Sequence, residues 1–195
     1  MPRRTKAQSE ATAAAILAAA RDLYARRGYA VVSVEEVAAA CGVTRGAVYH
    51  HFGSGPGLFA AVHADVTAGV GAAIERATDG VVDPWESLES GCRAFLAAVV
   101  ADDARQVVLV DGPAVLGWAR WREDDARSSG RLLDDVLAEL AEAGRVRAED
   151  VAATSALLSG AMNEAALWVA AAPDRDRALA QAWEALRRLL RGIAA

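Results

Sequence analysis

The sequence predicts an all-α protein with an N-terminal unit of three helices (residues 1–54) and a larger C-terminal helical domain (residues 55–195). The composition is globular, since 54% of the 195 residues are hydrophobic, 24% are charged and only five are proline. Apolar residues recur three and four positions apart, which is the spacing of one helix face. Capping residues, glycines and prolines separate these periodic stretches, and no sustained alternation predicts a strand.

The first two helices are predicted from an apolar face and from a cap. A helix is expected over residues 9–27, because Gly28 is suited to end it and five apolar residues share one face: Ile16, Leu17, Ala20, Leu23 and Tyr24. Ser33 and Glu36 have the spacing of a capping box, which predicts the start of a second, short helix.

The larger domain is expected to contain long helices that begin at prolines or acidic residues. Pro56 is suited to the first turn of a helix, and Pro173 separates the last two helices. One long helix is expected to bend near Ser128 and to end at Gly144. The predicted ranges are 56–78, 85–101, 103–110, 112–144, 150–171 and 174–193.

Residues 33–52 have the pattern of a helix-turn-helix. Gly42 tolerates the positive φ that a tight turn needs, Ala38 is small enough for two helices to cross closely, and Thr44 can cap the second helix. The N-terminal residues of such a second helix reach base edges in the major groove. We therefore predict DNA contacts for Ser33, Thr44, Arg45, Gly46, Ala47, Tyr49, His50 and His51.

Each of these contacts has an expected chemistry. Arg45 can donate two hydrogen bonds to one guanine, and Gly46 and Ala47 allow the backbone to approach the bases closely. Tyr49 and one of the two adjacent histidines are suited to phosphates. The competing interpretation of Arg45 is a solvated surface arginine.

The charge distribution agrees with DNA binding by the N-terminal unit. Residues 1–51 carry seven arginines or lysines and four carboxylates, a net charge of +3. The whole chain carries −5, so the remainder carries −8. A basic head on an acidic body is expected when only the head faces phosphates, although a solvated surface could produce the same asymmetry.

The stretch from Ser33 to Phe59 resembles the signature of the TetR family of regulators, including the Tyr49-His50-His51-Phe52 block. The resemblance implies a homodimeric repressor that binds a palindromic operator in double-stranded DNA and releases it when a small-molecule effector enters the larger domain. One position departs from the family pattern. Gly55 stands where family members usually carry a lysine that meets phosphate. This departure either lowers the expected DNA affinity or shifts the phosphate contacts to Arg3, Arg4, Lys6 and the backbone N–H groups near Ser54.

A ligand cavity and a dimer interface are also expected from the resemblance. We predict that ligand contacts come from Phe95, Trp118, Trp121, Arg122 and Asn163. The tryptophans lie on one helix face with Arg122, and an aromatic stripe of this kind is also typical of a protein core. The last two helices are expected to pair with a second copy through Leu157, Gly160, Trp168, Trp183, Leu186 and Leu190.

Other classes of function find little support. We find no phosphate loop, metal-binding spacing, nucleophile elbow or plausible catalytic triad, so neither an enzyme nor a cofactor is expected. Adjacent His50 and His51 diverge by about 100° on a helix, which disfavours a shared metal ion. Cys41 and Cys92 are expected to be buried structural thiols, His63 is expected to be an ordinary helix residue, and a cytoplasmic location without membrane contact is expected. The alternative to a regulator is a helical ligand-binding or scaffold protein whose helix-turn-helix does not function.

Overall fold

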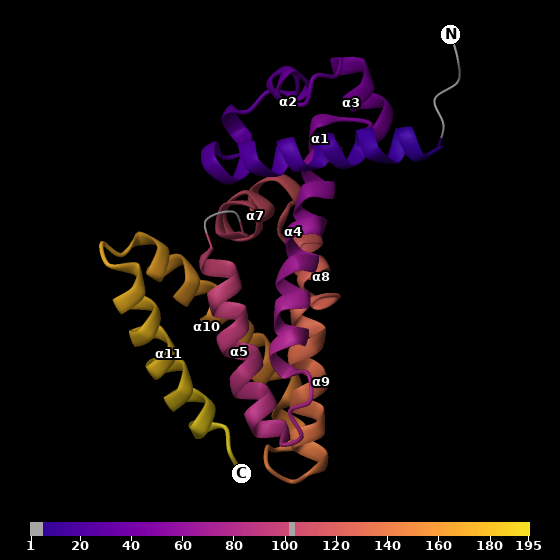
Figure 1. Cartoon of the computed structure of the whole chain (residues 1–195). Helices are drawn as coiled ribbons and strands as arrows, with labels where there is room; N and C mark the ends of the chain where they lie inside the picture. Colours follow the sequence, from indigo (N-terminus) through magenta and orange to yellow (C-terminus); the bar gives the residue numbers. More distant parts are fainter. Residues whose placement is uncertain (1–5, 102–103) are drawn as a thin grey trace.

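The structure is a computed structural model that describes residues 6–101 and 104–195. Every regular element in these ranges is helical, which confirms the all-α prediction (Figure 1). The head lies across one end of the long helix α4 (Gly55–Thr78), and α11 (Arg175–Gly192) lies farthest from α4 on the outer side of the larger domain. Arg3 and Arg4, which we expected to contact phosphate, lie outside the described residues.

The head consists of α1 (Lys6–Arg27), the short 3-10 helix η1 (Tyr29–Val31), α2 (Val34–Ala40) and α3 (Arg45–Phe52). Its helices share an apolar core with the first turns of α4 (Gly55–Thr78). Three aromatic rings of Tyr24, Tyr29 and Phe59 meet there, with centroids 5.0–5.8 Å apart. The fully buried members of this core include Ile16, Ala20, Tyr24, Val37, Val48, Leu58 and Phe59.

The larger domain adds four further long helices to α4: two pack on it directly, and the other two pack on those. The four helices are α5 (Pro84–Val100), α9 (Ser129–Glu142), α10 (Val151–Ala171) and α11 (Arg175–Gly192). The helix α4 is apolar and long enough to cross a membrane, but half of its most apolar window is buried among the other helices, as in the core helix of a globular protein. Its buried apolar face runs through Val62, Val66, Val70 and Ile74.

The segment between α5 and α9 differs from the expectation of a helix at 103–110 followed by one helix at 112–144. Residues 105–111 form a π-helix, η2 (Arg105–Asp111), and α7 (Gly112–Leu116) continues from it. Gly117 then adopts a φ of 81°, which ends α7 and starts α8 (Trp118–Ala126). The predicted bend near Ser128 is a break between α8 and α9. A final 3-10 turn, η3 (Ala148–Asp150), precedes α10.

Candidate nucleic-acid interface and ligand cavity

Local hydrogen bonds fix the two helices of the helix-turn-helix. The Ser33 hydroxyl accepts a hydrogen bond from the Glu36 amide (3.2 Å), and the Glu36 carboxylate accepts one from the Ser33 amide (2.9 Å), which completes the predicted capping box. These hydrogen bonds from Ser33, together with one from Arg27, lower the pKa of Glu36 to about 2. The Thr44 hydroxyl accepts from the Ala47 amide (3.2 Å) and caps α3. Gly42 makes the turn with a φ of 67°.

The predicted DNA-contacting residues divide into exposed and half-buried groups. Ser33, Thr44, Arg45, Gly46 and His50 are exposed. Ala47, Tyr49 and His51 are half-buried, and Val48 anchors the opposite side of α3 in the core. The Ser33 and Thr44 hydroxyls accept the capping hydrogen bonds of α2 and α3. Arg45, Gly46 and His50 form the exposed outer face of α3.

Arg45 is held by two neighbours when no DNA is bound. One nitrogen of its guanidinium lies 2.5 Å from the Glu35 carboxylate, and another donates to the Tyr49 hydroxyl at 2.9 Å. The hydrogen bond to Tyr49 and the charge of Glu35 raise the pKa of Arg45. A base or phosphate that binds Arg45 would therefore compete with Glu35 and Tyr49 for its N–H donors.

The junction between α3 and α4 has room for a side chain at Gly55 but not at Gly57. A Cβ atom at Gly55 would lie 3.5 Å from the Tyr29 hydroxyl, an ordinary contact distance. A Cβ atom at Gly57 would lie 2.2 Å from the Phe52 carbonyl oxygen, so only glycine fits there. A side chain at position 55, such as the lysine expected from the resemblance, is therefore not excluded by its Cβ atom. Lys6, which we expected to contact phosphate, is exposed and lies 3.8 Å from Glu10.

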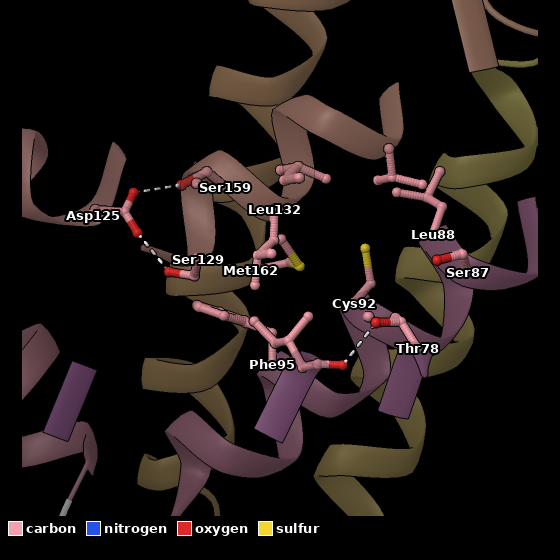
Figure 2. Close-up of a pocket in the computed structure, with 15 residues that line it drawn as sticks. Thr78, Ser87, Leu88, Cys92, Phe95, Asp125, Ser129, Leu132, Ser159 and Met162 are labelled. Carbon is pink, nitrogen blue, oxygen red and sulfur yellow. Dashed lines mark hydrogen bonds between the residues drawn. The ribbon is translucent and has the colours of Figure 1, made fainter. Parts of the chain in front are cut away.

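The larger domain contains two adjoining chambers. The larger chamber encloses about 570 Å³ of empty space, part of it open to solvent, between α4, α5, α9 and α10. Figure 2 shows its polar end, where the Asp125 carboxylate accepts hydrogen bonds from Ser129 (2.9 Å) and Ser159 (3.2 Å). The remaining wall is mostly apolar and includes Ile74, Leu88, Leu132, Leu133, Val136 and Met162.

The smaller chamber shares part of its wall with the larger one; its roughly 330 Å³ of unfilled space includes open solvent, and only about 10 Å³ can hold the centre of a water-sized group, enough for one polar group. Phe95, Asp125 and Ser129 line both chambers, which places them at the boundary. The other residues that line the smaller chamber are His63, Thr67, Val70, Val99, Val108, Leu109, Trp121 and Asn163.

The five predicted ligand contacts are therefore not equivalent. Phe95, Trp121 and Asn163 line a chamber. Trp118 is 66% exposed and stacks on Trp121 with centroids 4.9 Å apart, so its side chain covers the chamber wall from outside. Arg122 pairs with Asp125 (3.3 Å) and lines neither chamber.

Sequence reasoning missed four polar residues around this cavity. The sequence predicts an ordinary helix residue at His63 and assigns no role to Asp125, Thr67 or Asp111. All four are buried or half-buried. A usable signal was present for His63 and Thr67, because they fall at the same helix spacing as the buried Phe59, Val66 and Val70.

Hydrogen bonds connect the smaller chamber to the head. The Trp121 indole donates to the Val108 carbonyl within η2 (2.8 Å). At the end of η2, the buried Asp111 carboxylate accepts from the Tyr29 amide of η1 (2.8 Å) and from the Gln106 side chain (3.2 Å). One π-helical segment therefore contacts both a chamber wall and the DNA-binding head.

Two further predictions concern cysteines and histidines. Cys92 is buried, which raises the pKa of its thiol to about 12, whereas Cys41 is only half-buried and donates to the Val37 carbonyl. The rings of His50 and His51 are 5.3 Å apart, with His50 exposed and His51 half-buried beside Phe52. Among the described residues, no group of three or more His, Cys, Asp or Glu side chains is arranged to hold a metal ion.

The last two helices expose an apolar strip, but not through all six predicted interface residues. Leu157 (74% exposed), Gly160 and Trp168 lie on the outer face of α10. Leu186 and Leu190 are buried in the chain's own core, so they are not free to contact a partner, and the exposed leucine of α11 is Leu189. Trp183 is half-buried, with the Arg93 guanidinium 5.9 Å from its ring centre.

The fold and this motif define a helix-turn-helix regulator with a separate helical domain, and comparison with known proteins gives the family. Residues 16–62 match the model of bacterial regulatory proteins of the tetR family, and residues 85–193 match the tetracyclin repressor-like C-terminal domain. The chain belongs to the TetR family of DNA-binding transcriptional regulators.

Individual relatives agree with this assignment. A crystal structure of a TetR-family transcriptional regulator from Pectobacterium atrosepticum is 36% identical, and the match covers 98% of each chain with a TM-score of 0.81. The transcriptional repressor BepR of Brucella suis is 32% identical over 54% of this chain and 51% of its own length. The TetC protein of transposon Tn10 from Escherichia coli is 24% identical over 77% of this chain and 76% of its own length.

Proposed function

We propose that this protein is a dimeric repressor that binds a palindromic operator through α3 and leaves it when a small effector enters the cavity. The observation that carries the proposal is the outer face of α3, where Arg45, Gly46 and His50 are exposed on a helix held by the Thr44 cap and by Val48 in the core. Such a face fits a major groove. In this proposal residues 1–54 bind DNA, and residues 55–195 bind the effector and the second copy.

Dimerisation is supported by the apolar strip on α10 and α11. Leu157, Trp168 and Leu189 expose large apolar side chains on helices that otherwise pack on the protomer. A second copy would remove this strip from water and place two α3 helices on successive turns of DNA, about 34–36 Å apart. Palindromic half-sites follow from that two-fold symmetry.

Coupling between the cavity and DNA is supported by η2. A ligand that displaces Trp121 also displaces the Val108 carbonyl, and through the same π-helix it acts on the contact between Asp111 and the Tyr29 amide. A change of about 1–3 kcal/mol between the two states of the head is enough to alter operator occupancy severalfold or more.

Footprinting on the DNA upstream of the protein's own gene, supplemented by selection of bound genomic fragments, tests the proposal. The wild type is expected to protect a palindromic site. Arg45→Ala is expected to weaken that site by about 1–3 kcal/mol, because a bidentate contact to guanine is lost. Arg131→Ala removes the same charge from an exposed position on α9 and is the matched control.

Two results would contradict DNA reading by α3. One is equal protection by the wild type and by Arg45→Ala. The other is weak binding to all fragments, which would favour the alternative of a ligand-binding or scaffold protein with a helix-turn-helix that does not function. Salt titration separates a DNA-binding regulator from that alternative. The logarithm of the affinity of a protein that neutralises several phosphates falls linearly and steeply with the logarithm of the salt concentration.

A further inference from the structure

Three buried polar atoms at the smaller chamber have no hydrogen-bond partner among the described residues. They are both ring nitrogens of His63 and the hydroxyl oxygen of Thr67. His63 is 1% exposed and Thr67 is 8% exposed, and both side chains line the chamber from α4. A buried polar group without a partner is destabilising, because it has lost its hydrogen bonds to water, so such groups call for an explanation. Their position four residues apart on one helix face places them side by side.

The neighbouring protein groups do not meet this need. The closest carboxylate oxygen to His63, on Asp124, is 4.0 Å from Nδ1, beyond hydrogen-bond distance. Asp125 lines the chamber, but its oxygens already accept hydrogen bonds from Arg122, Ser129 and Ser159. The partner for His63 and Thr67 therefore has to come from the chamber itself, either as an ordered water or as the polar end of a ligand that displaces it.

The charges around the chamber disfavour an anion, and Asp125, the carboxylate that lines it, is already paired with Arg122 (3.3 Å), which leaves a neutral molecule as the best fit. Neither lysine nor arginine is among the residues that line the two chambers. Burial lowers the pKa of His63, against the opposing effect of Asp124, so this side chain is neutral at pH 7. An anion would thus lose its hydration without meeting a free cation, which is costly. The neutral imidazole offers a donor at one ring nitrogen and an acceptor at the other, and a hydroxyl group, which can both donate and accept, can bond to whichever nitrogen faces it.

The wall of the larger chamber indicates the chemistry of the remainder of the ligand. Its wall is mostly apolar, and it meets the smaller chamber at Phe95 and Ser129. An apolar body in the larger chamber would direct one end of the molecule past Phe95 toward His63 and Thr67.

We propose that the two chambers form one binding site for a neutral, mostly apolar molecule with a single hydroxyl group, an alcohol or a phenol, whose hydroxyl bonds to His63 and Thr67. The inference rests on the proposed function in one respect, since it takes this cavity as the effector site. It adds the chemical class of the effector and the two side chains that select it.

Three probes that share one apolar body test the selection. They are 4-propylphenol, propylbenzene and 4-propylbenzoate, and their binding to the full-length protein is measured by titration calorimetry at pH 7.5. The phenol is expected to bind about tenfold more tightly than propylbenzene, the equivalent of one well-placed hydrogen bond to a buried group. The benzoate is expected to bind more weakly than the phenol. Equal binding of phenol and propylbenzene, stronger binding of benzoate, or no binding of any probe overturns the proposal.

Thr67→Val tests the assigned side chain, because valine keeps the shape and removes the hydroxyl. The preference for phenol over propylbenzene is expected to fall severalfold, while the melting temperature of the free protein stays equal or rises, since an unpaired buried hydroxyl is removed. Thr78→Val is the matched control in the larger chamber. The Thr78 hydroxyl donates to the Ile74 carbonyl of its own helix (3.1 Å), so this variant is expected to keep the preference even if all affinities shift together. Loss of the preference in Thr78→Val, or its retention in Thr67→Val, contradicts the assignment.

A parallel measurement of operator binding separates this inference from the proposed function. Fluorescence anisotropy of labelled operator DNA is recorded without ligand and with each probe. Operator binding without any phenol preference in calorimetry would refute the inference and leave the regulator intact. A phenol preference lost in Thr67→Val, without binding to any DNA fragment, would support the inference and refute the proposed function.

Discussion

The contact between Asp111 and the head gives the sharpest prediction, and Asp111→Asn is the change that tests it. Asparagine keeps the size of the side chain but replaces one acceptor oxygen with an NH2 group. The Asp111 oxygens accept from the Tyr29 amide (2.8 Å) and from the Gln106 side chain (3.2 Å). In the variant, the new NH2 group of residue 111 must face either the Tyr29 amide or the Gln106 NH2 group, and two donors cannot form a hydrogen bond.

The expected loss follows from the burial and charge of this contact. Asp111 is 9% exposed, so the lost hydrogen bond is not replaced by bulk water. A hydrogen bond to a charged group contributes about 1.5–3 kcal/mol to stability. For a chain of this length each kcal/mol shifts the melting temperature by about 2–4 °C. Asp111→Asn is therefore expected to lower the melting temperature by about 3–12 °C.

Calorimetric melting of the free protein measures this loss, and Asp65→Asn is the control. Asp65 on α4 also contacts α1, through Arg21 at 3.1 Å, but about two-fifths of both side chains is exposed. An exposed pair contributes at most about 1 kcal/mol, so this variant should melt within about 4 °C of the wild type. Anisotropy with labelled operator then measures how far the effector weakens DNA binding, and this response should be smaller in Asp111→Asn.

Two outcomes would refute the reasoning. If Asp111→Asn melts like Asp65→Asn, the buried hydrogen bond does not contribute as its geometry indicates. If the variant melts early but responds fully to the effector, Asp111 stabilises the head without transmitting the signal through η2.

Three further predictions concern the outer face of α3 and its junction with α4, the apolar strip that we propose as the dimer interface, and the buried His63. Gly55→Lys should raise DNA affinity and steepen the salt dependence by about 0.9 in log–log slope, because space exists for the side chain and one phosphate contact is added; salt titrations of operator binding measure this. Leu157→Glu should convert the dimer into a monomer by placing a charge on the exposed strip of α10, as light scattering with size exclusion would record. His63→Leu should lessen the loss of melting temperature between pH 7 and pH 5.5. Burial lowers the pKa of His63, and the charge of Arg120 adds to this effect, whereas Asp124 and Asp125 oppose it. As the pH falls, His63 is therefore protonated first in the unfolded state, so acid destabilises the folded wild type.

Each of these three predictions has a control variant or a result that would contradict it. Gly57→Lys should disrupt the α3–α4 junction, because its Cβ atom would overlap the Phe52 carbonyl; an unchanged salt slope in Gly55→Lys would argue against phosphate near position 55. Val82→Glu adds the same charge to an exposed loop residue and should leave the dimer intact. Parallel melting curves of wild type and His63→Leu across the pH range would show that His63 does not titrate between the two states.

Local signals predicted the helix-turn-helix closely. Ser33 and Thr44 are the N-cap residues of α2 and α3, and each side chain accepts a hydrogen bond from the backbone amide three residues later. Gly42 supplies the turn between the two helices. These interactions span three or four residues, so the sequence alone specifies them. The bounds of α10 and α11 were predicted equally well, because Asp174 caps α11 beside Pro173.

Features that depend on distant partners were not predictable in this way. The π-helix η2 accompanies a hydrogen bond from Trp121 to Val108, thirteen residues apart, which no local pattern announces. Trp118 and Trp121 occupy the same predicted face, yet only Trp121 is buried. On α11, Leu186 and Leu189 are both apolar, and packing against α5 and α10 decides that Leu186 turns inward. Periodicity indicates that a face is apolar, but not which surface covers it.

The close packing at Gly112 bears on how this protein could be re-engineered as a biosensor. A Cβ atom at Gly112 would lie 2.9 Å from the Trp121 ring and 3.2 Å from the His63 ring, so these three residues form a unit that tolerates little change. Val70 and Val99 line the same chamber from α4 and α5 without belonging to that unit. Libraries that vary these two valines should change which molecules are detected, whereas changes at Gly112 should break the relay to the DNA-binding head. Selectivity for the apolar part of the ligand can thus be varied at Val70 and Val99, whereas His63 belongs both to the proposed hydroxyl site and to the close packing around Gly112.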